Sequence, residues 1–218
     1  MASSYKNVNC PSCGAPVEEI DRFAAMAVCE YCGSGFHFDE DAIKAMGKMA
    51  IMVEYPTPLY TGARGSFNGK RFTVVGRLRY RFERGFWDEW FLRADSGEEI
   101  WLAEESGDFY FQEELSDTTS VPPRESLKPG SRLNIAGSSV TVDEMDEAQL
   151  EGVEGALPYV VSMDRHFPYV NASQGDINVT IEYTSQGPLV YKGSWVDQGD
   201  IVLDEPKEDE EVDEWFDA

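Results

Sequence analysis

The chain has 218 residues, of which 42% are hydrophobic, and its formal net charge is −23 at pH 7. This length allows one large domain or two small ones, and this apolar content is ordinary for a chain that folds. The negative charge disfavours nucleic acid and anionic membranes as partners, because both carry the same sign. The exception is the segment 61–94, which carries 8 basic and 3 acidic residues.

The opening residues, MASSYKNVNC, contain no apolar stretch of the kind that a secretory signal needs. No run of the chain approaches the roughly 18 apolar residues of a membrane span. All four cysteines fall in two closely spaced pairs, which fits a reducing compartment better than a disulfide scaffold. We therefore expect a cytoplasmic protein without a transmembrane segment, which reaches a membrane only through a partner.

Two Cys-x-x-Cys pairs, 15 residues apart, contain the cysteines of the chain: Cys10, Cys13, Cys29 and Cys32. This spacing lies within the range of tetrahedral zinc sites, since a tight turn directs both sulfurs of a pair at one ion. Gly14 and Gly33 follow the pairs, where such turns favour glycine. The pattern predicts a zinc ribbon over residues 1–38; the alternative is a redox dithiol pair.

Four cysteines complete a tetrahedron and leave no position for water, which predicts one structural zinc ion rather than a catalytic one. His37 is then expected to face solvent rather than to bind the metal. A ribbon of this size cannot bury a core of its own, so the metal should supply its folding energy.

Residues 39–58 are predicted to connect the ribbon to the rest of the chain. Acidic residues at 39–41 precede apolar residues that recur at spacings of three and four, which indicates a helix over residues 40–53. Tyr55–Pro58 should end this helix and begin a linker. The methionines of the helix offer a partner groove as an alternative, but a packed connector is the simpler interpretation.

The stretch Arg71–Arg93 alternates with period two and predicts a long strand, a short turn and a second strand rich in aromatic residues. The first strand should have one apolar face, formed by Phe72, Val74, Gly76, Leu78, Tyr80 and Phe82. The opposite face should carry a ladder of basic side chains, formed by Arg77, Arg79 and Arg81.

Strand and turn patterns continue to residue 203 and predict a mainly β fold. A Ser/Thr/Pro-rich linker at 116–128 separates a first β unit, 59–115, from a second, 129–203. The start of the second unit echoes the start of the first, which suggests two related small antiparallel β units of barrel or sandwich type. Residues 143–155 are expected to form a short helix or an acidic loop.

Glu89 is predicted to be a half-buried carboxylate that pairs with Arg77 or Arg79 on the neighbouring strand. Alternation places it beside Trp87 and Phe91, where an unpaired charge would be costly. The alternative is a solvent-facing acid next to Asp88.

The last residues, 204–218, carry 9 acidic side chains and one lysine, and this composition predicts a disordered tail. Trp215 and Phe216 near its end suit a peptide that is attracted by charge and anchored by its rings in a basic groove. That groove would belong to a partner or to the ladder of Arg77, Arg79 and Arg81. The alternative is a solvated tail with incidental aromatic residues.

Several short motifs resemble a bacterial family: Gly65-Ser-Phe67, Phe72–Gly76, Trp87-Asp-Glu-Trp90, Trp101–Glu104, Glu154–Pro158 and Tyr191-x-Gly-x-Trp195. It is the domain-of-unknown-function family forty-one seventy-eight, and the resemblance covers roughly residues 59–197. It implies a bacterial cytosolic protein in the neighbourhood of membrane-stress or polyamine-related genes. The family has no established activity, so the resemblance transfers no catalytic residue.

The sequence contains no recognisable catalytic motif. His166 lies in an expected turn, and Trp87, Trp90 and Trp101 suit the core of a β unit better than a stacking site. We therefore predict a non-enzymatic protein-interaction adaptor. The alternative is a nucleic-acid or anionic-surface binder that uses the ribbon and the Arg77/Arg79/Arg81 strand. A protein that acts on or binds a small cation, such as a polyamine, is a more distant third.

Overall fold

The structure is a computed structural model that describes residues 5–40 and 42–205. Within these residues the regular elements are strands and two single-turn 3-10 helices, which confirms the predicted mainly β fold. The helical turns are η1 (Arg124–Ser126) and η2 (Gln198–Asp200). Residues 206–218, with Trp215 and Phe216, lie outside the described residues. The first residue of the predicted tail, Asp204, forms an ion pair with Arg71.

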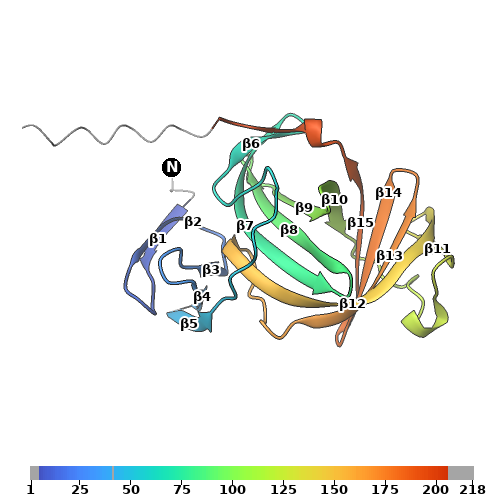
Figure 1. Ribbon diagram of the computed structural model, residues 1–218, viewed down its shortest axis with the longest axis horizontal. Helices are drawn as coiled ribbons and strands as arrows, with labels where there is room; N and C mark the ends of the chain where they lie inside the picture. Colours follow the sequence, from blue (N-terminus) through green and yellow to red (C-terminus); the bar gives the residue numbers. More distant parts are fainter. Residues whose placement is uncertain (1–4, 41, 206–218) are drawn as a thin grey trace, which may run out of the picture.

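Eight antiparallel strands form a closed barrel (Figure 1). The order around the barrel is β7, β8, β9, β10, β15, β14, β13 and β12, and β12 pairs back with β7. Their bounds are β7 (Lys70–Phe82), β8 (Gly85–Ala94), β9 (Glu99–Glu105), β10 (Asp108–Glu114), β12 (Ser138–Leu157), β13 (His166–Gln174), β14 (Ile177–Thr184) and β15 (Gly187–Val196).

Each of the two predicted β units supplies four consecutive barrel strands, and two seams join the units. One seam is β7 with β12, and the other is β10 with β15. A short strand precedes each set: β6 (Arg64–Phe67) pairs with β7, and β11 (Arg132–Ile135) pairs with β12. Both hairpins turn through two residues with positive φ, Asn68–Gly69 and Ala136–Gly137. The two units are thus structural repeats that together close one barrel.

The predicted continuous apolar face of β7 is wrong, because a β-bulge at Val75 divides the strand. Before the bulge, Phe72 and Val74 pack outside the barrel against Leu59 and its neighbours. Beyond it, even-numbered residues such as Leu78 belong to the apolar cluster inside the barrel. An extra residue in one strand shifts the side-chain alternation by one, so the two halves of β7 bury opposite faces.

Segments without long strands cover the outer faces of the barrel. Residues 57–67, with β16 (Ile201–Leu203), cover strands β7 to β10. The linker and β11 cover strands β12 to β15, where Leu127 packs on the apolar cluster and Tyr183 Oη donates to Pro122 O at 3.0 Å. The barrel therefore has apolar residues outside its wall as well as inside it.

The expected helix over residues 40–53 is wrong, since this segment contains a strand. The edge of β4 (Ser34–Phe38) offers unpaired backbone groups, and β5 (Ile43–Lys48) pairs with it. Gly47 has φ +97°, which an α-helix does not accept. Residues 143–155, expected as a helix or loop, lie inside β12.

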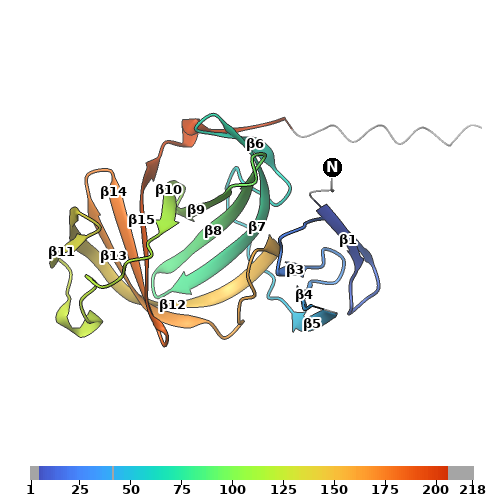
Figure 2. The same cartoon turned by 180° about the vertical axis from the view of Figure 1, so that it is seen from behind.

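The N-terminal ribbon packs against the outside of the barrel near β7 and the end of β12 (Figures 1 and 2). Its remaining strands are β1 (Tyr5–Asn9), β2 (Pro16–Asp21) and β3 (Met26–Val28). β3 continues the barrel sheet through the pairs Ala27 with Ala156 and Met26 with Leu157. An ion pair from Arg93 to Asp21 (Nε–Oδ2 2.9 Å) adds a second attachment.

Candidate functional site

The four cysteines gather at one end of the ribbon, with their sulfur atoms within 4.8 Å of one another. Each pair lies on a turn in which the following glycine amide donates to the first cysteine carbonyl, Gly14 to Cys10 at 2.9 Å and Gly33 to Cys29 at 2.8 Å. Both glycines have positive φ, +80° and +69°. The turns thus direct all four sulfurs at one point, as predicted.

The distances between sulfurs fit a tetrahedral metal ion. Cys10 and Cys32 Sγ lie 3.8 Å apart, as do Cys13 and Cys29 Sγ. Bonds of about 2.3 Å to a central zinc ion place tetrahedral sulfurs about 3.8 Å apart, whereas a disulfide needs about 2.05 Å. The four cysteines can therefore hold a metal ion. His37 lies half-buried on β4 and is not part of this group.

The predicted basic ladder on β7 is not an open binding surface. Arg77 and Arg79 are only 7% and 1% exposed, and both donate to the Asp88 carboxylate on β8. Arg81 is exposed and pairs with Glu151. Of the three arginines, only Arg81 therefore presents its guanidinium to solvent.

The predicted partner of Glu89 is also wrong. Cross-strand register places Arg79 opposite Asp88, so Asp88 rather than Glu89 takes both arginines. Glu89 is half-buried, as predicted, but its side chain faces the interior of the barrel. There its Oε1 accepts a hydrogen bond from Trp87 Nε1 at 3.2 Å.

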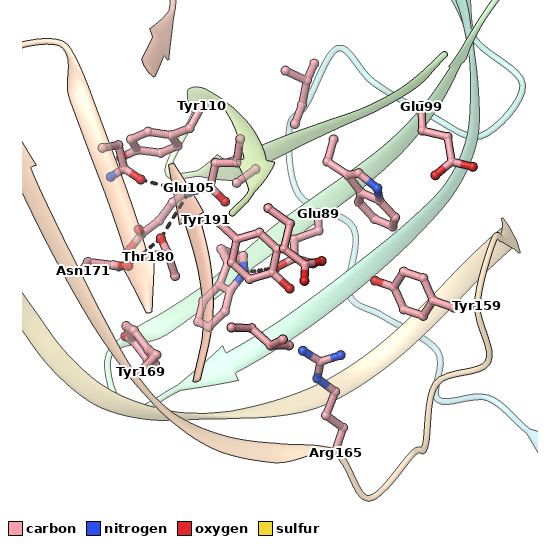
Figure 3. A pocket seen from close by; sticks show the side chains of 18 residues that line it. Glu89, Glu99, Glu105, Tyr110, Tyr159, Arg165, Tyr169, Asn171, Thr180 and Tyr191 are labelled. Carbon is pink, nitrogen blue, oxygen red and sulfur yellow. Dashed lines mark hydrogen bonds between the residues drawn. The ribbon is translucent and has the colours of Figure 1, made fainter. Parts of the chain in front are cut away.

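A cavity of about 470 Å³ occupies the interior of the barrel (Figure 3). Alternate residues of β8, β9, β10, β13, β14 and β15 line it, together with Tyr159 and Arg165 from the connection between β12 and β13. Its aromatic side chains are Trp87, Trp101, Tyr110, Tyr159, Tyr169 and Tyr191, and its charged ones are Glu89, Glu99, Glu105, Glu114 and Arg165. A second cavity, of about 490 Å³, lies between the ribbon and the barrel and has a mainly small and aliphatic lining.

Arg165 and Glu182 form an ion pair at the cavity, with Nη2 and Oε2 2.5 Å apart. The Glu182 side chain is 3% exposed. Burial raises the pKa of Glu182 to about 8, the negative charge of Glu89 adds to the shift, and Arg165 acts against it. Burial also raises the pKa of Glu89, while the Trp87 hydrogen bond and Arg165 act in the opposite direction. Two carboxylates thus share the field of one guanidinium.

The cavity was not predicted, although several of the strands that line it share a sequence pattern. On β9, β13, β14 and β15 the inward positions toward the cavity are mostly aromatic, charged or amide residues, while the outward positions are aliphatic. A strand with one polar face is normally interpreted as exposing that face to water. Here the covering segments bury the apolar faces, and the polar faces line the interior.

His166, predicted to be structural, lies exposed at the start of β13 and pairs with Glu147 at 3.2 Å.

Trp90 packs outside the barrel and donates to Glu104 Oε2 at 2.8 Å, as a core residue would. Trp87 and Trp101 instead form walls of the cavity. Trp90, His37 and His166 are not part of this lining.

No helix in the described part of the chain is long and apolar enough to cross a membrane. No curated protein and no solved structure gives a significant match to the chain. A family model described as "Domain of unknown function (DUF4178)" matches residues 60–198, which span all eight barrel strands and their short leading strands. Because this match covers more than half of the sequence, the chain belongs to the DUF4178 family.

Proposed function

We propose that the protein is a non-enzymatic binding protein whose barrel holds a small molecule and whose cysteines hold a structural zinc ion. The observation that carries the proposal is the interior cavity of about 470 Å³, whose lining combines aromatic and aliphatic side chains with charged and amide ones. Small-molecule sites have this size and this mixture of surfaces. Eight-stranded barrels are also just wide enough to hold one small ligand.

Zinc is the metal that suits the cysteine site best. Four thiolates with tetrahedral spacing favour zinc or iron–sulfur chemistry among the common biological metals. The four sulfurs lie within 4.8 Å of one another, so a single ion bound by all of them would have its ligand positions filled, and its role would be to fold the ribbon onto β12. Unbridged thiolates of this kind also suit a reducing compartment such as the cytoplasm.

A binding role is favoured over catalysis by the placement of the reactive side chains. All four cysteines belong to the metal group, His37 lies in the ribbon, and His166 lies on the outer surface. The predicted role as an adaptor for a protein partner in bacterial membrane stress is a separate property, which would depend on the outer surface. The nucleic-acid alternative loses its main support, because Arg77 and Arg79 are buried.

Filling the cavity tests the binding proposal. Ala103 lines the cavity on β9, and Ala103→Trp would occupy it with a bulky ring. Glu113→Trp is the matched control, because Glu113 is exposed and lies between the cavity residues Gln112 and Glu114 on β10. Circular dichroism would first establish that both variants keep the β fold.

The readouts are a thermal-shift screen against a library of primary metabolites and mass spectrometry of small molecules released from the purified protein. We expect compounds that stabilise the wild type and Glu113→Trp but not Ala103→Trp. The proposal fails if no compound is released from the wild type and none stabilises it. It also fails if Ala103→Trp responds like the wild type, because the cavity is then not the binding site.

A further inference from the structure

We propose that the barrel cavity binds an organic cation, whose charged group lies at Glu89 and whose apolar body packs on the surrounding aromatic rings. This inference rests on the proposed function and adds the chemical class of the ligand. It follows from the balance of charge in the cavity, from the aromatic walls and from a buried hydroxyl without a partner.

The cavity has more negative than positive groups. Its lining includes four glutamates and one arginine. That arginine, Arg165, contacts the buried Glu182 rather than Glu89, and its single positive charge is outnumbered by the four glutamates of the lining. Glu89 lies on β8, on the opposite side of the barrel from Glu182 on β14. It forms no ion pair within the described residues, and Trp87 donates a hydrogen bond to it. A positive charge on a ligand would compensate Glu89, whereas an anion would meet four carboxylates.

The walls around Glu89 suit an organic cation rather than a metal ion. Figure 3 shows Glu89, Arg165, Tyr159 and Tyr191 converging on one part of the cavity. Trp101 stacks on Tyr159 with ring centroids 5.8 Å apart, which extends the aromatic wall. Aromatic faces attract ammonium and guanidinium groups through their quadrupoles. Within the described chain, the cysteines are the group of metal-binding side chains close enough to hold an ion.

Tyr80 supplies a further unused polar group beside this site. It lies on β7 directly opposite Trp87, and the two rings stack with centroids 5.3 Å apart. Its hydroxyl is buried and makes no hydrogen bond within the described residues. Buried hydroxyls normally have a partner, so this unmet one marks an incompletely satisfied wall behind Trp87, close to the charges of Glu89 and Arg165; Tyr80 itself is not part of the cavity lining.

The test compares probes that share one shape and differ in charge. One set is tryptamine, 3-ethylindole and indole-3-acetate, and the other is hexylamine, 1-hexanol and hexanoate. Isothermal titration calorimetry at neutral pH would measure each against the wild type and Glu89→Gln. Glu113→Gln is the matched control, since it removes one charge from the exposed outer face of β10.

We expect at least one amine to bind about tenfold or more tightly than the neutral and anionic members of its set. Glu89→Gln should remove most of that advantage and leave the neutral probe unchanged, and Glu113→Gln should behave like the wild type. The inference is overturned if neither amine binds, if an uncharged or anionic member binds as tightly, or if Glu89→Gln binds the amine normally. Compounds whose binding Ala103→Trp abolishes would still support a ligand-binding barrel in those cases, so the two proposals fail separately.

Discussion

Arg79 and Asp88 face each other on the neighbouring strands β7 and β8 and form a two-point ion pair on the outer face of the barrel, beneath the segment that covers it. Arg79 Nε and Nη2 donate to Asp88 Oδ1 and Oδ2 at 2.7 and 2.8 Å. Both side chains are excluded from water, at 1% and 2% exposure. Arg79 Nη1 also donates to the carbonyl of Val53, so the pair holds the segment before residue 57 on the barrel.

Asp88→Asn should therefore be strongly destabilising. Asp88 compensates two buried guanidiniums, those of Arg79 and Arg77, and removing one partner of a buried pair costs about 3–5 kcal/mol. Urea unfolding monitored by circular dichroism would measure the loss. Glu154→Gln is the control, because Glu154 pairs with Arg77 from an exposed position and such pairs contribute about 0–1 kcal/mol. Equal losses in the two variants would show that Asp88 is not the buried anchor.

The seam between β10 and β15 depends on Gly193. A Cβ atom built there would lie 1.6 Å from the carbonyl oxygen of Phe111 on β10. The strands must separate to admit it, so Gly193→Ala should cost about 3 kcal/mol or more, at the upper end of overpacking penalties. Gly85→Ala is the control, since a Cβ there meets only the Phe82 ring at 3.5 Å. Similar urea midpoints for both variants would contradict this role for the seam.

The sequence predicted the cysteine cluster and the repeated β unit because both depend on local chemistry. The spacing of the cysteines places them on two tight turns, and Asn68–Gly69 forms the turn between β6 and β7. The partner of Glu89 could not be predicted, since the bulge at Val75 sets the register between β7 and β8. A bulge adds one residue without a distinctive sequence pattern and moves every later side chain to the other face.

The cavity could not be predicted for a different reason. Whether the polar face of a strand meets water or a barrel interior depends on what covers the other face. In this fold that cover comes partly from residues far away in sequence, such as β16, which pairs with β6 on the outside of strands β7 to β10. β5 has a local cause instead, since the edge of the preceding strand β4 decides its conformation more strongly than helical spacing does.

The cysteine site gives a prediction about metal removal. Protein purified without added metal should contain one zinc ion per chain by elemental analysis. Cys29→Ser should lose the ion and unfold the ribbon, because binding energy is folding energy in so small a unit. The barrel should stay folded but less stable, since β3 donates Met26 to its interior cluster.

Two-dimensional NMR would separate the two parts, with collapsed dispersion for ribbon amides and retained dispersion for barrel amides. Ser12→Ala is the control, because Ser12 is exposed in the turn between Cys10 and Cys13 and contributes no thiolate. A metal-free wild-type protein with a fully dispersed ribbon spectrum would contradict a structural metal.

Glu182 links the stability of the barrel to pH. Burial raises its pKa to about 8, well above the ordinary value for a glutamate. Between these two values the folded protein binds a proton that the unfolded chain does not, so the contribution of this group is present at low pH and is lost as pH rises through about 8. Glu89, Glu104 and Glu105 also have a pKa raised by burial and act with the same sign.

Glu182→Gln should therefore flatten the fall in unfolding free energy between about pH 5 and pH 8, by on the order of a few kcal/mol. The amide can still accept a hydrogen bond from Arg165 but does not titrate. Urea midpoints across this pH range would measure the slope, and Glu113→Gln, on the exposed outer face, should keep the slope of the wild type. If Glu182→Gln keeps that slope too, then Glu182 is ionised throughout this range and Arg165 outweighs its burial.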